Sequence, residues 1–356
     1  MNELGNLSWE AEARYRARVR GCLLGGALGD ALGYPVEFDA LDAIRAAYGP
    51  RGLRGPVADG SGAVGLVSDD TQMTLFTVEG LQQAHARERH KGIGGGWSRL
   101  VRTAYGRWLD TQTAPGPAPD VRGGLAAQTW LYARRAPGNA CLSGLREREY
   151  CPDPASELGP PGPVNPDSKG CGSVMRSAPF GLTRTSAESA FAMAARCSQM
   201  THGHPTASYA SGALAAIVTH LVAGDSLEGA VLRALRLLAR HPAHEETTTA
   251  LNRALDLASE GAPSAEKVES LGAGWIAEEA LAIAVYCALA EYTVTDALLL
   301  SVNHSGDSDS TGSLCGNLLG ALHGDHGLPH AWLEQVEGRA TITLLADDLA
   351  AECVRR

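Results

Sequence analysis

Apolar residues recur at every third or fourth position along most of this chain, a spacing typical of α-helices that bury one face. Strict alternation of apolar and polar residues over more than five positions is hard to find, so strands are expected to be a minor element at most. The pattern therefore predicts an all-α fold. Helices are expected over 1–25 and at Phe191–Met200, Ala207–Val222, Leu227–Ala239, Leu251–Ala258, Ala277–Ala290 and Ala331–Cys353.

Three segments interrupt the helical pattern. Pro50–Val67 is rich in glycine, and Ala114–Arg122 and Cys151–Ser168 are rich in proline, with six prolines in the last segment. Proline is not tolerated inside a helix, so these segments are expected to be loops. No change of composition flanks the proline-rich loops near 114–122 and 151–168, and residues 1–356 are therefore predicted to form a single domain.

Two rows of glycine have a regular spacing of four residues. The first comprises Gly21, Gly25, Gly29 and Gly33, and the second comprises Gly312, Gly316, Gly320 and Gly324. On a helix this spacing forms one ridge, and each glycine inside a helix costs about 1 kcal/mol relative to alanine. Close approach of another helix would compensate, so both segments are predicted to be central, tightly packed helices. The alternative is a pair of glycine-rich loops.

Composition and charge narrow the class of protein. The chain has 356 residues, 44% of them hydrophobic, which is enough for a large core. Its formal net charge of −10 excludes a broadly basic surface for nucleic acid. No apolar stretch is judged to approach the ~20 residues that cross a bilayer, and Met1–Arg20 has no apolar signal core, so no membrane partner is expected. Eight scattered cysteines without a C-x-x-C pair favour reduced thiols and a cytoplasmic protein.

The first acidic cluster is Ser68-Asp69-Asp70, which precedes an apolar helical pattern. Ser68 is a plausible N-cap, and carboxylates in a first turn compensate the helix dipole. That structural explanation accounts for one aspartate better than for two, because adjacent carboxylates repel each other unless a cation lies between them.

The second cluster, Asp307-Ser308-Asp309-Ser310, also opens an apolar helical pattern. Its start is similar to a calcium-binding EF-hand loop, but Leu318 stands at the twelfth position, where that loop needs glutamate. What remains is a set of hard oxygen donors suited to Mg²⁺, Mn²⁺ or Ca²⁺. Together the two clusters offer enough carboxylates for one or two divalent ions. The alternative is two independently capped helices.

Three further segments carry candidate chemistry. Glu37 stands between two apolar residues just after the first glycine row, where partial desolvation would suit a proton carrier, whereas Asp30 is expected to cap or to form structural hydrogen bonds. Lys169–Arg176 places small residues ahead of an expected helix, an arrangement that exposes N–H groups to phosphate oxygens. His202 and His204 form an H-x-H pair, for which a structural or ligand-contacting role is favoured over zinc because no third ligand lies at a matching spacing.

Taken in order, these segments resemble the ADP-ribosylglycohydrolase family, which includes the dinitrogenase-reductase-activating glycohydrolases and the ADP-ribosyl-acceptor hydrolases. The matching segments run from residue 21 to residue 324: GCLLGGALGDALGYPVEF (21–38), SDDTQMTLF (68–76), GCGSVMRSAPFG (170–181), THGHP (201–205) and HSGDSDSTGSLCGNLLGALHG (304–324).

The resemblance implies a compact orthogonal multi-helix bundle with a cleft for two Mg²⁺ or Mn²⁺ ions. It assigns Glu37 as the catalytic residue. It assigns the metal ligands as Ser68, Asp69, Asp70, Asp307, Asp309 and Ser310, and the substrate-binding residues as Gly172, Ser173 and His202. The chain departs from the family at Cys171, where many members have asparagine, and at Ser310, where threonine is usual.

The function implied is metal-dependent hydrolysis at the anomeric carbon of an ADP-ribosylated acceptor, which is either a protein side chain or a small molecule. ADP-ribose or an ADP-ribosylated substrate is the expected partner, and nucleic acid is expected only as an ADP-ribosylated acceptor. The alternatives are a non-catalytic ADP-ribose-binding or structural relative and a metal-dependent phosphohydrolase.

Overall fold

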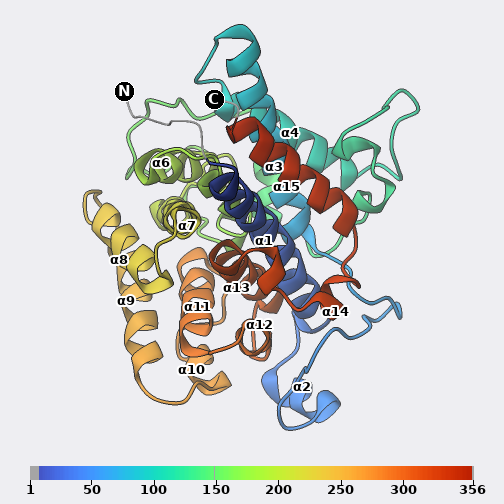
Figure 1. The fold of residues 1–356 in the computed structure, drawn as a ribbon, viewed down its shortest axis with the longest axis vertical. Helices are drawn as coiled ribbons and strands as arrows, with labels where there is room; N and C mark the ends of the chain where they lie inside the picture. Colours follow the sequence, from blue (N-terminus) through green and yellow to red (C-terminus); the bar gives the residue numbers. More distant parts are fainter. Residues whose placement is uncertain (1–7, 148, 355–356) are drawn as a thin grey trace.

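The computed structural model of the chain describes residues 8–147 and 149–354 (Figure 1). Met1–Leu7, part of the stretch for which no secretion signal is expected, lies outside them. The α-helices are α1 (Trp9–Gly33), α2 (Leu41–Tyr48), α3 (Asp69–Lys91), α4 (Trp97–Thr111), α5 (Asn139–Glu147), α6 (Ala187–Ser198), α7 (Pro205–Ala223), α8 (Leu227–Leu238), α9 (Glu245–Ser259), α10 (Ala265–Glu269), α11 (Ala277–Ala290), α12 (Val294–Val302), α13 (Ser308–His323), α14 (His330–Leu333) and α15 (Arg339–Val354). Short 3₁₀ turns are η1 (Tyr34–Val36), η2 (Leu125–Ala127), η3 (Thr129–Leu131), η4 (Cys171–Ser173), η5 (Ala178–Leu182) and η6 (Asp325–Gly327).

The all-α prediction is confirmed. Within the described ranges, β pairing is limited to two isolated bridges, Ala58–Val64 and Gly170–Ile276. Side-chain caps define several helix starts, as at Ser186 before α6 and Ser226 before α8, where the hydroxyl oxygen accepts a hydrogen bond from a backbone N–H of the first turn. The proline-rich segments expected to be loops contain no helix.

The single helix expected over Ala331–Cys353 is wrong. The chain forms α14, leaves the helix, and begins again at α15. Gly338, immediately before α15, has a φ of +68°, a left-handed conformation that interrupts a right-handed helix. The apolar spacing continues on both sides of this break, so the hydrophobic pattern did not reveal it.

The prediction that both glycine rows are tightly packed helices is confirmed, and the rows face each other. α1 and α13 run antiparallel, and their contact is the most extensive between any two elements of the described chain. A Cβ built on Gly25 would lie 2.3 Å from the carbonyl oxygen of Gly316, and one built on Gly29 would lie 1.9 Å from that of Gly312. Only glycine permits this separation of two helix backbones.

The same contact places the site. At Gly33, the last glycine of the first row, a Cβ would lie 2.2 Å from the carbonyl oxygen of Ser308, the first residue of α13. The C-terminal end of α1 therefore lies directly against the N-terminal end of α13. Asp30 lies near the end of α1 and Glu37 follows that helix, whereas Asp307 and Asp309 lie at the start of α13.

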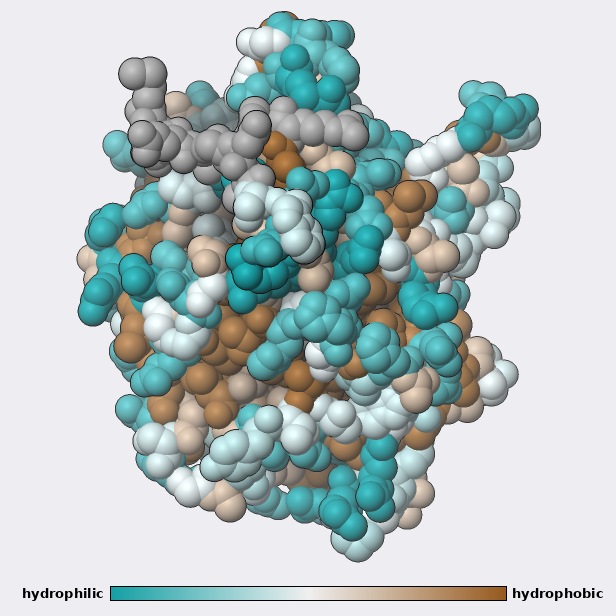
Figure 2. Space-filling model, viewed as in Figure 1, coloured by the Kyte–Doolittle hydropathy of each residue, from teal (hydrophilic) through white to brown (hydrophobic). Residues whose placement is uncertain are grey.

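Other helices surround this central pair (Figure 1). α3 and α15 pack against α1, while α7, α11 and α12 pack against α13. On the face shown in Figure 2, hydrophobic residues lie in patches between hydrophilic ones, and no single hydrophobic surface extends across the whole face. Inside the protein, the buried hydrophobic residues of the described chain form one cluster that includes residues of α1 and α13.

One helix, α7, is long and apolar enough to cross a membrane by length and composition alone, so the expectation that no segment is so is wrong. α7 has 19 residues and a mean hydropathy of 1.3 over its most apolar window, and 78% of that window is buried inside the protein. Its side chains pack against α6, α8 and α13. The burial explains the hydropathy, because a helix that is surrounded by other elements has no need of a polar face.

Candidate active site

Two helix N-termini bring the acidic clusters together. Ser68 is the N-cap of α3, and its hydroxyl oxygen accepts a hydrogen bond from the Asp70 N–H at 3.2 Å. Asp307 is the N-cap of α13, and its carboxylate accepts from the Ser310 N–H at 3.3 Å. Asp69 and Asp309 occupy the first turns. The capping role expected from sequence is therefore present, and it coexists with the convergence of the two clusters.

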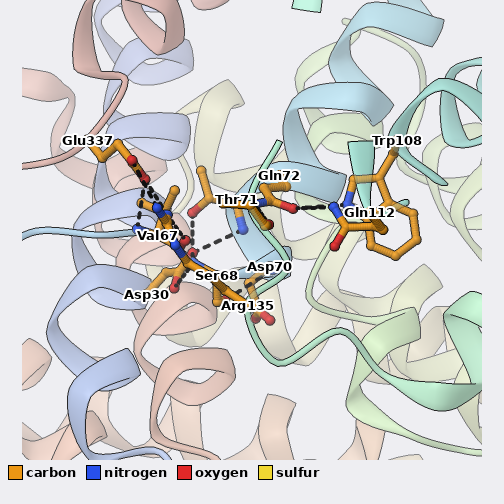
Figure 3. A network of polar contacts seen from close by, with 11 residues as sticks. Asp30, Val67, Ser68, Asp70, Thr71, Gln72, Trp108, Gln112, Arg135 and Glu337 are labelled. Atoms are coloured by element: carbon orange, nitrogen blue, oxygen red, sulfur yellow. Dashed lines mark hydrogen bonds and ion pairs between the residues drawn. The ribbon is translucent and has the colours of Figure 1, made fainter. Parts of the chain in front are cut away.

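Asp30 links α1 to the start of α3. Its buried carboxylate accepts hydrogen bonds from the N–H groups of Ser68, at 3.0 Å, and Thr71, at 3.1 Å, and from the Thr71 hydroxyl (Figure 3). A carboxylate that satisfies the free N–H groups of a helix terminus fixes that terminus in place. Asp30 has the structural role expected for it, and it positions Asp69 and Asp70 relative to α1.

A second set of polar contacts holds the segment that leads into α3. Arg135 donates to the Val67 carbonyl oxygen at 2.7 Å and forms an ion pair with Glu337, with Nη2 to Oε1 at 3.1 Å (Figure 3). Gln72, one turn into α3, accepts hydrogen bonds from the Trp108 indole at 3.2 Å and the Gln112 amide at 2.9 Å. Elements distant in sequence therefore hold both sides of the first acidic cluster.

The acidic residues line a cavity of about 220 Å³. Oxygens of Glu37, Asp307 and Asp309 lie within 4.8 Å of one another, and all three side chains are buried. The candidate residues that line the cavity are Glu37, Asp69, Asp70, Gly172, His202, Asp307, Asp309 and Ser310, and the candidates Ser68 and Ser173 are not part of its lining. The two acidic stretches thus share one space with Glu37.

Burial and mutual repulsion make these carboxylates hard to ionise together. Burial is the main cause that raises the pKa values of Glu37, Asp69, Asp70 and Asp307, and the charge of Asp309 is the second cause for each. The pKa of Asp309 is itself raised by burial, although hydrogen bonds from Ser310 and others oppose the rise. Without a compensating cation, the cluster therefore retains protons near neutral pH.

Two carboxylate oxygens in this cavity have no hydrogen-bond partner among the described residues. They are Oε2 of Glu37 and Oδ1 of Asp70, and both are buried. A buried polar atom without a partner costs about 1–3 kcal/mol. Hard oxygen atoms that converge on a space without a donor fit Mg²⁺, Mn²⁺ or Ca²⁺, whereas zinc prefers nitrogen and sulfur ligands.

The glycine-containing segment after the second proline-rich loop forms another wall of the cavity. The helix expected there is wrong, because the chain makes the 3₁₀ turns η4 and η5 instead. Ser173 is folded into η4, where its hydroxyl and its N–H both donate to the Gly170 carbonyl oxygen. The Gly172 N–H, in contrast, donates to no other atom of the described residues. Gly172 therefore offers a free donor at the cavity.

Cys171, the first residue of η4, joins this wall to the acids. Its Sγ is 2.7 Å from Oδ2 of Asp307, and Ser310 also contacts the thiol. Burial and the neighbouring carboxylates raise the pKa of Cys171, so the sulfur stays a neutral thiol beside these charges. Cys171 thus contacts an acid of the cluster directly.

The two histidines of the H-x-H pair have separate roles. His202 is buried and lines the cavity, with Nδ1 2.7 Å from the Thr201 hydroxyl oxygen. His204 is the N-cap of α7, and its Nδ1 accepts from the Thr206 N–H at 3.2 Å. The two residues do not share one ligand position, in agreement with the preference for structural or ligand-contacting histidines over a zinc pair.

Sequence reasoning missed an aromatic pair, Trp275 and Phe38, of which Trp275 lines the cavity. Trp275 lines the cavity and stacks on Phe38, with ring centres 5.8 Å apart and planes 15° apart. Phe38 is 76% exposed and Trp275 is 42% exposed. The glycines of Gly272-Ala273-Gly274 indicate a turn before Trp275, and both have positive φ angles ahead of α11, but they do not indicate which residues Trp275 contacts. The position of Trp275 beside Phe38 and Glu37 depends on a contact between distant parts of the chain, which leaves no local signature in the sequence.

Comparisons with known proteins identify the family. The model of the ADP-ribosylglycohydrolase family matches residues 11–356. The ADP-ribosyl-[dinitrogen reductase] glycohydrolase of Rhodospirillum rubrum is 27% identical over 90% of each chain. The ADP-ribosylarginine hydrolase Tri1 of Serratia proteamaculans is 24% identical over 93% of this chain and 78% of its own. The ADP-ribosylhydrolase ARH3 of Homo sapiens is 25% identical over 95% of this chain and 94% of its own.

A solved structure shows the same fold. It is described as an ADP-ribosylglycohydrolase-related protein complex, and it aligns with a TM-score of 0.66 over 96% of this chain and 99% of its own, at 23% identity. The likeness extends over nearly the full length of both chains and supports the observed helical arrangement.

Proposed function

Since this chain belongs to the ADP-ribosylglycohydrolase family and is a hydrolase of glycosyl bonds, we propose that it cleaves the bond at the anomeric carbon of an ADP-ribosylated acceptor with two divalent cations, Mg²⁺ or Mn²⁺. The observation that carries the metal dependence is the pair of unpartnered carboxylate oxygens, on Glu37 and Asp70, in one buried acidic cavity. Such atoms are satisfied by protons or by a cation, and at neutral pH a cation satisfies several of them at once.

The ligands we propose come from the two helix N-termini. They are Asp69 and Asp70 with the Ser68 hydroxyl, and Asp307 and Asp309 with the Ser310 hydroxyl. When bound, divalent cations supply Lewis-acid stabilisation and orient hydroxyl groups and water. Carboxylates and hydroxyls are the oxygen donors that these ions take. Serine at position 310 offers a hydroxyl beside these carboxylates.

Glu37 is the residue we assign to proton transfer. Burial is the largest cause that raises the pKa of Glu37, and it favours the protonated carboxyl group that gives a proton to a leaving atom. The bond between the anomeric carbon and the acceptor breaks, the acceptor takes the Glu37 proton, and water adds its hydroxyl to the carbon. The remaining proton of that water restores Glu37. The products are free ADP-ribose and the unmodified acceptor.

The wall around η4 is proposed to hold the diphosphate. Gly172 offers a free N–H at the cavity, and His202 lies against the same segment. Ser173 is proposed to act indirectly, because its bonds to Gly170 shape the turn that presents Gly172. A small set of donors on one wall is sufficient in an acidic chain, since the potential at the site depends on local groups and not on net charge.

A panel of ADP-ribosylated substrates, carrying arginine, serine, nucleic-acid and small-molecule acceptors, tests the proposal. Each is incubated with the protein and Mg²⁺ or Mn²⁺, and products are identified by mass spectrometry. Free ADP-ribose together with intact acceptor is the expected result. AMP with ribose phosphate would indicate a phosphohydrolase, and binding of ADP-ribose without any product would indicate a non-catalytic relative. Full activity in excess EDTA would contradict the metal dependence.

All eight cysteines lie within the described residues, and none of them is paired in a disulfide there. We propose on this basis a reducing compartment such as the cytoplasm, because thiols persist there as thiols.

A further inference from the structure

Arg176 is a fully buried cation behind the wall of the cavity. It is 1% exposed, and no carboxylate within the described ranges forms an ion pair with it. Its Nη2 donates to the Thr201 hydroxyl oxygen at 2.5 Å, and its guanidinium carbon lies 4.7 Å from the centre of the Tyr105 ring. Because burying a charge without a carboxylate partner is expensive, the few contacts it makes are informative. Its hydrogen bond to an oxygen atom is the one to Thr201, the residue that precedes His202.

Thr201 transmits this contact to His202. The Thr201 oxygen is 2.7 Å from Nδ1 of His202 and 3.3 Å from the Ser198 carbonyl oxygen. An arginine can only donate, so the hydroxyl oxygen is an acceptor toward Arg176 and has a single hydrogen left to donate. The shorter of the two separations is typical of a hydroxyl donor, whereas the longer one exceeds the usual range for such a bond. The hydroxyl hydrogen therefore points to Nδ1, which accepts it with its lone pair.

The charge of Arg176 favours the same arrangement. A ring nitrogen that faces a nearby cation is more stable with a lone pair than with a positive N–H hydrogen on that side. Burial, followed by the Arg176 charge, lowers the pKa of His202 to about 3, so the imidazole is neutral. A neutral imidazole whose Nδ1 is an acceptor carries its hydrogen on Nε2.

The Nε2 edge of the ring faces the proposed diphosphate wall. A Cβ built on Gly170 would lie 3.1 Å from Nε2, and one built on Gly172 would lie 3.2 Å from Cε1. These contacts are tight, so the ring edge fits against the turn only because both positions lack side chains. Gly170, Gly172 and His202 all line the cavity. The hydrogen on Nε2 is therefore presented where the free N–H of Gly172 is also found.

We propose that Arg176 and Thr201 are positioning residues that fix His202 in its Nε2–H form, so that the neutral ring donates a hydrogen bond to an oxygen of bound ADP-ribose. The assignment of the ligand rests on the proposed function, whereas the form of the ring is a property of the free protein. Arg176 orients Thr201, Thr201 occupies Nδ1, and Nε2 contacts the ligand.

Long-range ¹H–¹⁵N correlation NMR on histidine-labelled protein tests the ring directly. The expected wild-type spectrum shows His202 with a protonated Nε2 and an accepting Nδ1, without metal or substrate. Thr201→Val, of similar shape but without the hydroxyl, is expected to lose this single form, and Thr201→Ser is expected to recover it. A wild-type ring with hydrogen on Nδ1 would overturn the proposal, as would a Thr201→Val spectrum identical to that of the wild type.

Calorimetric titration with ADP-ribose tests the consequence. Thr201→Val is expected to weaken binding about tenfold or more, as for loss of a hydrogen bond to a charged group, and Thr201→Ser is expected to recover most of the affinity. In a His202→Ala background, Thr201→Val should have no further effect, because the hydroxyl acts through the ring. An equal loss in both backgrounds would show a merely structural role and overturn the proposal. A correct ring form in a wild-type protein that binds no ADP-ribose would contradict the proposed function and leave the positioning intact.

Discussion

The glycine contact and the acidic cavity are adjacent regions built by the same two helices, and they are opposite in character. Along α1 and α13, side chains are absent and the backbones touch. At the end of that contact, carboxylates gather in a space where they repel one another. The first region is stable as it stands, whereas the second needs protons or cations.

The difference indicates how a repulsive cluster is kept in place. Asp309 lies one turn from Gly312, and Asp30 lies next to Gly29, so the packed helix pair fixes both carboxylates. A helix contact without side-chain freedom cannot separate to relieve the repulsion. The stability of one region thus maintains the strain of the other, and substitutions in the two regions should have opposite effects on stability.

The largest effect is expected for side chains introduced into the glycine contact. Gly29→Leu and Gly316→Leu would each bring a Cβ within 1.9 Å of a carbonyl oxygen of the partner helix. Because neither backbone can yield without moving a whole helix, each variant should lose more than about 4 kcal/mol of stability or fail to fold. Thermal and urea unfolding measure this loss.

Gly60→Leu is the matched control, since a Cβ there meets nothing within 4 Å. It should unfold at nearly the wild-type temperature. A melting temperature unchanged in both Gly29→Leu and Gly316→Leu would show that the backbones of α1 and α13 are not in close contact.

The next effect concerns the acids. Asp309→Ala and Asp70→Ala remove proposed cation ligands, and each should abolish metal-dependent release of ADP-ribose, a loss of about 10³-fold or more given the several kcal/mol that a bound metal supplies. Without metal, the same variants should be no less stable than the wild type, because a repelling charge is gone. Product assays and melting curves in EDTA measure the two effects. Asp42→Ala, on the exposed side of α2, is the control, and full activity in either cavity variant would defeat the metal proposal.

A smaller effect is expected at Glu37. Glu37→Gln keeps the shape of the side chain but cannot transfer a proton, so turnover should fall about 10²-fold or more while ADP-ribose binding stays nearly intact. Single-turnover rates and calorimetry separate the two quantities. Asp39→Asn, two residues away and exposed, should change neither quantity. Equal losses of rate and affinity in Glu37→Gln would argue against proton transfer.

The smallest effect is the pH dependence of stability. Carboxyl groups whose pKa is raised on folding hold protons that the unfolded chain releases near pH 4, so the free energy of unfolding falls as pH rises from there toward the folded pKa. From pH 7 to pH 8 the limit is about 1.4 kcal/mol for each group that stays protonated. Cations replace those protons.

Calorimetry in EDTA should therefore show the melting temperature falling between pH 7 and pH 8, and saturating Mn²⁺ should reduce the slope. This window lies above the ordinary pKa of histidine, near 6.5, so the buried histidines contribute little to it. The buried thiols, whose ordinary pKa is near 8.5, lower the stability in the same direction, but they do so with and without Mn²⁺. Identical slopes with and without Mn²⁺ would show that the cavity holds no displaceable protons.

The amino-acid sequence by itself determined the helical class, the loops at the proline-rich segments and the close packing of two glycine-rich helices. These features follow from local rules, namely apolar periodicity, the exclusion of proline from helices and the four-residue ridge. The break at Gly338 and the 3₁₀ turns after Lys169 were not determined locally, because the apolar pattern is compatible with a helix at both places.

Only the tertiary structure decided which residues share the cavity. The glycine rows predicted close helix partners, but it is their pairing with each other that brings the C-terminal end of α1 to the N-terminal end of α13. Sequence motifs named Asp69, Asp309 and Glu37, whereas the stacking of Trp275 on Phe38 and the contact from Arg176 through Thr201 to His202 depend on long-range packing. The physical reason is that periodicity specifies which face of a helix is buried and not which partner buries it.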